Sequence, residues 1–340
     1  MSMKKIKVED AVGMALGHDI TAMFDGFKGP LFRRGHVIEE EDIPKLLDIG
    51  KKTVFAGDID PGMLHEEDCA RALADMTKIE GAHFEGPSEG KMLLVSDIKG
   101  MLKVDTKLLK KINSIGDITI TTLPDHYRVE EGDRLASMRI VPLFTDKAQI
   151  DEAEKLCAAS HLLELLPYKD LKSGIIITGS EVYEGRIKDR FEPVVRKKLS
   201  YFPGSITGIK ICDDDMQMII NAAKELMEEG ADFLIFTGGM SVDPDDLTPG
   251  AIKALGAEIL SHGVPSQPGN MTLAAYIGDI PVLGVPGAAI SLPTTIFDVL
   301  LPQIFTGLKL TKEDLIRLGD GGLCQMCSNC HYPNCTFGRY

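Results

Sequence analysis

The sequence predicts an α/β fold, a mostly parallel sheet flanked by helices over residues 171–308, preceded by a β-rich α+β region. Over residues 171–308, short apolar runs alternate with amphipathic stretches of helical length, an order typical of parallel βαβ units. Over residues 1–170, short apolar runs alternate with Gly, Pro and Asp, which favours small β-rich domains with turns at the glycines. A chain of 340 residues is too long for one compact core, so we expect two or three domains.

Within the α/β region, apolar runs predict strands at residues 174–178, 206–211 and 233–236. One helix is predicted at residues 191–199. Another follows the three acids at 213–215, since the positive end of a helix dipole favours carboxylates.

The end of this region predicts a hairpin. Residues 272–277 and 280–285 flank the two-residue turn Gly278-Asp279. Ser291 is the expected cap of a last helix.

We expect four segments along the chain. They are a β-rich α+β region at 1–150 that can hold two small subdomains, a linker helix at 151–170, the α/β domain at 171–308, and a helix with a cysteine-rich tail at 309–340. In the first segment, helices are predicted at 40–47 and 66–79, and strands at 54–55, 92–95, 118–121 and 138–143.

Composition argues against some classes of function. A nucleic-acid-binding protein would present a basic face, whereas the formal net charge here is −14. The first ten residues lack the apolar run of a signal peptide, and prolines break the longest uncharged run, residues 280–297. We therefore expect a cytoplasmic protein with a small-molecule partner, no nucleic acid and no membrane.

The most informative stretch is a glycine-rich loop rich in acids. A predicted strand runs into Gly238-Gly239, and three carboxylates follow, Asp243, Asp245 and Asp246. Thr248 then opens a helix. Glycines at the end of a strand let a ligand approach the backbone, and a helix N-terminus attracts phosphate. The alternative is an ordinary strand-to-helix turn with solvated acids.

Two further loops, 179–189 and 286–291, carry polar groups at the ends of predicted strands. Because parallel strands bring their carboxyl ends to one edge of a sheet, we expect all three loops to line one pocket.

A family resemblance follows from these motifs. The chain contains, in order, Thr-Gly-Ser-Glu-Val with Gly-Arg-Ile-x-Asp, then Asp-Asp-Asp, then Thr-Gly-Gly-x-Ser with Asp-Asp-Leu-Thr-Pro, then Val-Leu-Gly-Val-Pro-Gly. Over residues 172–308 this set resembles the molybdopterin-binding domain shared by MoaB, MoeA and CinA-type proteins. The resemblance implies a parallel sheet between helix layers, a pocket for a phosphorylated pterin or a nucleotide, and a homo-oligomer. MoeA-like proteins also carry small β-rich domains ahead of this one.

Carried over position by position, the resemblance implies a set of site residues. The acids Asp246, Glu181 and Asp189 would be the catalytic groups. Molybdopterin would lie on Thr178, Gly179, Gly238, Gly239, Ser241, Asp243, Asp245, Pro286, Gly287 and Ser291. Amides and a hydroxyl suit its phosphate, and carboxylates suit pterin N–H groups or Mg²⁺.

The chain also departs from the family pattern. Molybdenum-inserting members carry Lys-Pro-Gly-Lys before the hairpin, where this chain has Gln267-Pro268-Gly269-Asn270. Arg190-Phe191 follows Asp189 where the family has Ser/Thr-Asn. Two positive charges would matter strongly beside a molybdate dianion, so the departures favour pterin binding over molybdenum transfer.

A cluster of cysteines closes the chain, with the spacing C-x₂-C-x₂-C-x₄-C: Cys324, Cys327, Cys330 and Cys335. The spacing is too compact for a zinc ribbon, and its first three cysteines resemble the start of a bacterial ferredoxin run. His331 is a substitute ligand in this interpretation. The tail is predicted to bind Zn²⁺ or an iron–sulfur cluster, with a redox-active dithiol or a disordered tail as alternatives.

Three functions are compatible with the sequence. The first is a molybdopterin-binding protein of molybdenum-cofactor biosynthesis, which would transfer a nucleotidyl group or insert metal if it is an enzyme. The second is a CinA-like hydrolase of a nucleotide pyrophosphate, identified by turnover with a divalent metal. The third is a non-catalytic pterin carrier, or a metal or redox sensor, identified by tight binding without turnover.

Overall fold

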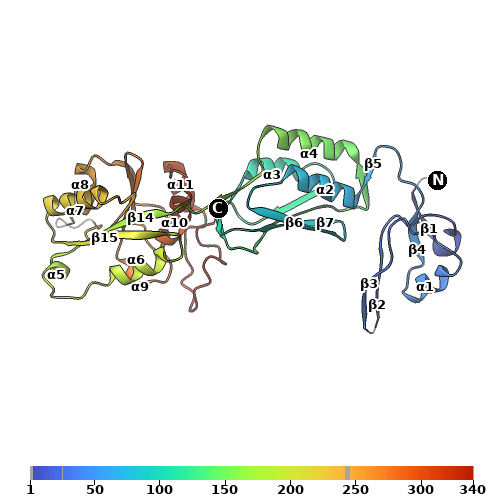
Figure 1. Cartoon of the computed structure of the whole chain (residues 1–340), viewed down its shortest axis with the longest axis horizontal. Helices are drawn as coiled ribbons and strands as arrows, with labels where there is room; N and C mark the ends of the chain where they lie inside the picture. The colour runs from blue at the N-terminus through green and yellow to red at the C-terminus, as the bar shows by residue number, and fades with distance from the viewer. Residues whose placement is uncertain (1–2, 25, 242–245, 340) are drawn as a thin grey trace. The chain divides into compact units, whose positions relative to one another are not determined.

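The computed structural model describes residues 3–24, 26–241 and 246–339 (Figure 1). The chain divides into two compact units, neither of them continuous in sequence. The first unit comprises residues 1–97, 105–123 and 132–163, and the second comprises 98–104, 124–131 and 164–340.

The first unit begins with a small β-rich part around a single apolar cluster that includes Val8, Leu16, Ile20 and Leu46. Antiparallel pairs join β1 to β4 and β2 to β3. The elements are β1 (Lys4–Lys7), the 3₁₀ turn η1 (Val8–Asp10), β2 (Ile20–Phe24), β3 (Phe27–Phe32), α1 (Asp42–Asp48) and β4 (Thr53–Ala56).

The rest of the first unit is a four-stranded antiparallel sheet in the order β6-β7-β11-β9, with α2 packed against β7, β11 and α4. This arrangement confirms the β-rich α+β prediction. Its elements are β5 (Met63–His65), α2 (Glu66–Met76), β6 (Ala82–Ser88), β7 (Lys91–Ser96), α3 (Thr106–Ile112), β9 (Ile118–Thr122), β11 (Arg134–Ile140), β12 (Phe144–Asp146) and α4 (Lys147–Ala159).

A buried histidine makes the first unit sensitive to pH. The His65 side chain caps α2, where its Nδ1 accepts from the backbone N–H of Glu67 at 3.2 Å and from Arg34 Nη1 at 2.8 Å. Burial, and secondarily the charge of Arg34, lowers the pKa of His65 to about 4. An unfolded chain titrates near pH 6.5 and therefore binds the proton first as the pH falls. The free energy of unfolding should decrease from about pH 6.5 towards pH 4.

We expect amide protons of α2 to be less protected from exchange at pH 5 than at pH 7, after correction for intrinsic exchange rates. In a His65→Asn variant, which keeps a good helix cap, this difference should disappear. The exposed His83 on β6 offers a matched control, and His83→Asn should behave like the wild type. Equal wild-type protection at both pH values would contradict the assignment.

The second unit is built on a six-stranded sheet in the order β15-β14-β16-β19-β18-β17 (Figure 1). Strands β15, β14, β16 and β19 are parallel, and β18 and β17 continue the sheet antiparallel. The strands are β14 (Leu171–Thr178), β15 (Gly204–Cys212), β16 (Phe233–Thr237), β17 (Glu258–His262), β18 (Leu273–Ile277) and β19 (Ile280–Val285). The predicted parallel sheet and hairpin are confirmed.

Helices cover both faces of this sheet because alternate strand residues face opposite sides. On β14, Ile175 and Ile177 pack with α6 and α10, whereas Ile176 packs with α7 and α8. The helices are α5 (Ser180–Tyr183), α6 (Phe191–Leu199), α7 (Met216–Glu228), α8 (Thr248–Ala254), α9 (Ala288–Ser291), α10 (Ile296–Thr306), α11 (Lys312–Ile316) and the 3₁₀ turn η2 (Arg317–Gly319).

A three-stranded sheet, in the order β10-β8-β13, also belongs mainly to the second unit. Its strands are β8 (Gly100–Val104), β10 (Tyr127–Val129) and β13 (Leu163–Pro167). The linker helix predicted over residues 151–170 is therefore shorter than expected. Helix α4 ends at Ala159, and β13 follows, because its residues pair with a strand from far earlier in the chain.

Ser291 is not the cap of the last predicted helix. It ends α9, and Pro293 interrupts the chain before α10 begins. Thr295 caps α10 instead, in a capping box with Asp298. Within the described residues, every helix is too short or too polar to cross a bilayer.

Candidate functional site

A pocket of about 270 Å³ opens at the sheet edge where β14, β15 and β16 end. Each of these strands contributes the loop that follows it, and α9 contributes Ile290. The pocket is lined by the predicted site residues Thr178, Gly179, Glu181, Asp189, Gly238, Gly239 and Asp246. The structure thus brings together groups that are up to 68 positions apart in the sequence (246 − 178).

Other predicted residues lie elsewhere. The lining does not include Ser241, Pro286, Gly287 or Ser291, and the hydroxyl of Ser291 donates to the carbonyl of Ala288 in its own helix at 3.4 Å. The third predicted loop therefore reaches the pocket through Ile290. Asp243 and Asp245 lie outside the described residues.

The turn after β16 requires glycine. The φ angles are +84° at Gly238 and +53° at Gly239, in the region that side chains rarely adopt. A Cβ on Gly238 would lie 2.1 Å from the carbonyl oxygen of Thr178. The Thr178 hydroxyl is itself 3.1 Å from the hydroxyl of Thr248, and both side chains are buried. Two loops thus meet backbone to backbone at the base of the pocket.

Two of the pocket acids have structural partners. The carboxylate of Asp189 accepts from the backbone N–H groups of Phe191 at 2.9 Å and Glu192 at 2.7 Å, so it caps the first turn of α6. Asp214 accepts from the backbone N–H of Ser180 at 2.9 Å and so ties the loop after β14 to the loop after β15. Asp214 was predicted only at a helix N-terminus, and its position in the pocket was missed.

The Ser180 hydroxyl also hydrogen-bonds to the carboxylate of Asp213 at 2.6 Å, which lowers the pKa of Asp213. These bonds fix the loop that carries Glu181, whose side chain is exposed at the pocket. Glu181 is thus well placed to meet a ligand, and the half-buried Asp246 lines the same pocket.

Two cations at the pocket were missed as site residues. Lys188 and Arg190 line it, both side chains are exposed, and neither forms a hydrogen bond or ion pair with another residue in the described part of the chain. The sequence signal was the placement of basic residues on both sides of Asp189. These charges favour an anionic ligand.

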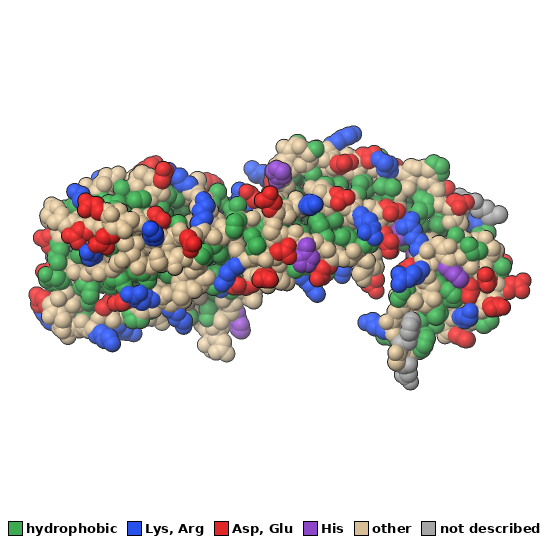
Figure 2. All heavy atoms as spheres, in the orientation of Figure 1, with side chains coloured by type: hydrophobic (Ala, Val, Ile, Leu, Met, Phe, Trp, Pro, Cys, Tyr) green, Lys and Arg blue, Asp and Glu red, His purple; other side chains and the backbone are tan. Residues whose placement is uncertain are grey.

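On the face shown in Figure 2, Lys and Arg side chains alternate with Asp and Glu and do not gather into one basic patch.

A separate cavity of about 350 Å³ is lined by Cys324, Cys327, Cys330 and Cys335, together with His331. All four are free thiols. In the part of the chain that the structure describes, no three His, Cys, Asp or Glu side chains are grouped to hold a single metal ion. The predicted metal site at these cysteines stays a prediction, as does Mg²⁺ at the first pocket.

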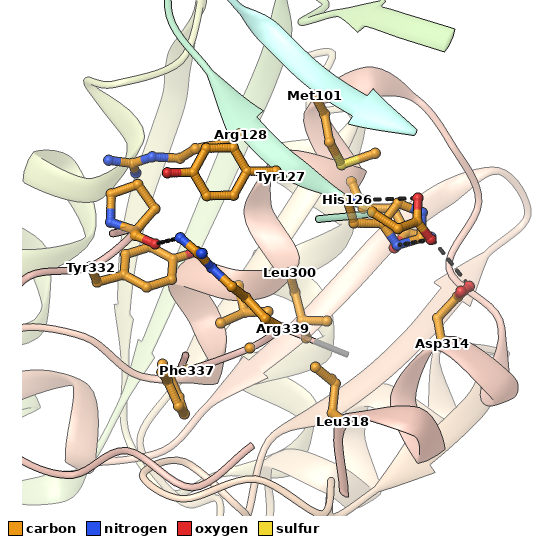
Figure 3. A pocket seen from close by; sticks show the side chains of 15 residues that line it. Met101, His126, Tyr127, Arg128, Leu300, Asp314, Leu318, Tyr332, Phe337 and Arg339 are labelled. Carbon is orange, nitrogen blue, oxygen red and sulfur yellow. Dashed lines mark hydrogen bonds and ion pairs between the residues drawn. The ribbon is translucent and has the colours of Figure 1, made fainter. Parts of the chain in front are cut away.

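A third, much smaller cavity of about 30 Å³ lies beside His126 (Figure 3). Arg317 bonds to Nδ1 of His126 and lies 3.5 Å from Asp125, and burial lowers the pKa of His126. A space of this size accommodates only water. The position of His126 is therefore structural, and its network holds residues 124–128 against the C-terminal part of the second unit.

Comparisons with known proteins agree with the motifs. Residues 174–306 match a family described as "Probable molybdopterin binding domain", and residues 5–58 match a domain of unknown function. A molybdopterin molybdenumtransferase of Synechococcus elongatus is 28% identical over 186 residues, covering 50% of this chain and 46% of that protein. The molybdopterin molybdenumtransferase of Bacillus subtilis is 31% identical over 121 residues, covering 34% of this chain and 28% of that protein.

Among solved structures, the tungsten cofactor synthesizing protein MoaB from Pyrococcus furiosus is 23% identical. The match covers 42% of this chain and 98% of that chain, with a TM-score of 0.36. The chain spans less than half the length of the curated relatives named above.

Proposed function

We propose that the chain, whose residues 174–306 match the family described as "Probable molybdopterin binding domain", binds a phosphorylated pterin and transfers an oxometalate to it. The observation that supports this most is the pocket at the end of β14, β15 and β16. There a glycine turn, four acids and the two cations Lys188 and Arg190 come together.

The proposed roles follow from the chemistry of each group. Gly238 and Gly239 leave the backbone open to a close approach, which suits a phosphate. Asp246 and Glu181 would accept hydrogen bonds from pterin N–H groups. Lys188 and Arg190 would balance the charge of the phosphate and of the oxometalate substrate, in place of the lysines missing at residues 267–270.

A resident Mg²⁺ does not fit the described acids well. Asp189 already caps α6 and Asp214 already bonds to Ser180. No three acids in the described residues converge on one ion. The proposal therefore routes no step through Mg²⁺.

One rival function has an observation in its favour. Four carboxylates, those of Glu181, Asp189, Asp214 and Asp246, line the pocket, and this charge suits a metal–nucleotide complex. Hydrolysis of a nucleotide pyrophosphate with added divalent metal would select this rival.

The first test is equilibrium binding of molybdopterin to anaerobically purified protein. We expect a Kd in the micromolar range or tighter, and an Asp246→Asn variant should bind about tenfold more weakly because it loses one charge-assisted hydrogen bond. The exposed Asp279, in the turn of the β18–β19 hairpin, provides the control Asp279→Asn, which should bind like the wild type.

Three outcomes separate the functions. Molybdate-dependent conversion of the bound pterin would support metal transfer. Tight binding without conversion would identify a carrier. No binding at all would overturn the proposal and direct the assay to nucleotide pyrophosphates.

A further inference from the structure

The cysteine tail is a folded part of the second unit. The backbone N–H of Gln267 donates to the carbonyl of Gly322, and the N–H of Cys324 donates to the carbonyl of Gln267, both at 2.8 Å. Through these bonds, Leu323 at the start of the tail pairs with Gln267 in a short parallel β-bridge. The cysteines therefore begin from a fixed backbone.

The other end of the tail is also anchored. The hydroxyl of Tyr332 donates to the carbonyl of Asp298 in α10 at 3.1 Å, and Phe337 is 3% exposed. The guanidinium of Arg339 lies 4.6 Å from the Tyr127 ring centre, and the ring centres of Tyr332 and Phe337 lie 6.4 Å apart (Figure 3). The loop between these two anchored ends lines the 350 Å³ cavity, and all four cysteines are among the lining residues.

Two of the sulfur atoms lie within hydrogen-bond distance of a group that can donate to a thiolate. Met326 has a φ of +50°, uncommon for a residue other than glycine, and its backbone N–H donates to Cys324 Sγ at 3.4 Å. The hydroxyl of Thr294 lies 3.1 Å from Cys330 Sγ. A thiolate can only accept, so Thr294 would donate to it. Hydrogen bonds to ligating sulfurs hold the ligands in position and tune the bound metal.

We propose that Cys324, Cys327, Cys330 and Cys335 bind a [4Fe–4S] cluster in this cavity. A single tetrahedral Zn²⁺ has Zn–S bonds of about 2.3 Å, which requires its four sulfurs to lie within about 4 Å of one another. Within the described residues, no three such side chains are grouped to hold one metal ion, although all four cysteines line a single cavity of about 350 Å³. In a cubane cluster each cysteine binds a different iron, so the ligands stand apart around a common centre.

The neighbouring side chains suit such a cluster. Apolar groups, which include Pro268, Leu292, Tyr332 and Phe337, line much of the rest of the cavity. Cys327 and Cys330 are exposed, so the cluster would lie near the surface and be sensitive to oxygen. This site shares no residue with the pocket at β14, β15 and β16, and the proposal does not depend on pterin binding.

The test is anaerobic purification of the full chain, reconstitution with ferric iron, sulfide and a thiol that reduces part of the iron, and measurement of iron, sulfide, zinc and visible absorption. We expect about four irons and four sulfides per chain, as a [4Fe–4S] cluster requires. Cys327→Ser and Cys330→Ser should lose most of the iron and the charge-transfer absorption. Cys157→Ser, at a half-buried thiol on α4, should keep both.

A second variant separates ligation from folding. Thr294→Val should retain the cluster but lower its reduction potential, because it removes a donor to a ligating sulfur. The proposal is overturned by one bound zinc per chain with no iron after reconstitution. It is equally overturned if the four thiols form disulfides under anaerobic conditions, or if the two serine variants keep the wild-type iron content while folded by circular dichroism.

Discussion

Replacing Gly238 with alanine is expected to abolish pterin binding and destabilise the second unit by about 3 kcal/mol or more. The left-handed conformation at φ +84° costs a side chain about 1–2 kcal/mol. The new Cβ would also lie 2.1 Å from the carbonyl oxygen of Thr178, which is backbone and cannot rotate away. Forcing extra atoms into a packed position costs about 1–3 kcal/mol more.

Gly256 offers a matched control. Its φ is +83°, almost the same as that of Gly238, but nothing among the described residues lies within 4 Å of the position that a Cβ would occupy. In Gly256→Ala the free energy of unfolding should therefore fall only by the cost of the left-handed backbone conformation, about 1–2 kcal/mol, and the variant should still bind pterin. Denaturant unfolding and pterin binding would be measured on both variants. If Gly238→Ala were no less stable than Gly256→Ala, the close contact with Thr178 would be refuted.

Much of the second unit could be predicted because its local signals agree with its tertiary structure. Helix α6 begins and ends where it was predicted, at Phe191 and Leu199. The strands β14 and β16 were visible as apolar runs because they are buried on both faces, as central parallel strands are. The three loops could be expected at one edge because parallel strands end together.

Strand pairing between residues far apart in the sequence could not be predicted from local patterns. Apolar residues at 162–166 also fit the periodicity of α4, and the structure instead pairs them with β8, about 60 residues earlier. At this pair, a Cβ on Gly100 would lie 2.4 Å from the Leu166 carbonyl oxygen, so the strands meet closely. A local pattern carries no information about such a partner.

The site shows the same limit. The acids and glycines that belong to a motif were identified. Arg190 was interpreted only as a departure from the family pattern, and Lys188 only as part of the polar loop 179–189. The positions of Lys188 and Arg190 in the pocket depend on the conformation of the loop after β14. The hydrogen bond from Ser180 to Asp214 and the capping of α6 by the Asp189 carboxylate fix that conformation. Spacing in the sequence does not specify that turn.

Reversing the charges of Lys188 and Arg190, the two cations that line the pocket, should weaken pterin binding about 100-fold at low salt. Each charge-assisted hydrogen bond contributes about 1.5 kcal/mol or more, which is about tenfold in Kd per residue. The change is the double variant Lys188→Glu with Arg190→Glu. Lys197→Glu, on an exposed position of α6 outside the pocket, makes the same kind of change where no ligand contact is expected.

The salt dependence of pterin affinity distinguishes direct contact between these two cations and the ligand from a longer-range electrostatic attraction. Exposed charges act over about 10 Å at 0.1 M ionic strength and over about 3 Å at 1 M. If Lys188 and Arg190 touch the phosphate or the oxometalate, part of the difference between wild type and double variant should persist at high salt. If they act only through the field, the difference should vanish there. Equal affinities of the double variant and Lys197→Glu at low salt would mean that backbone amides hold the anion without either cation.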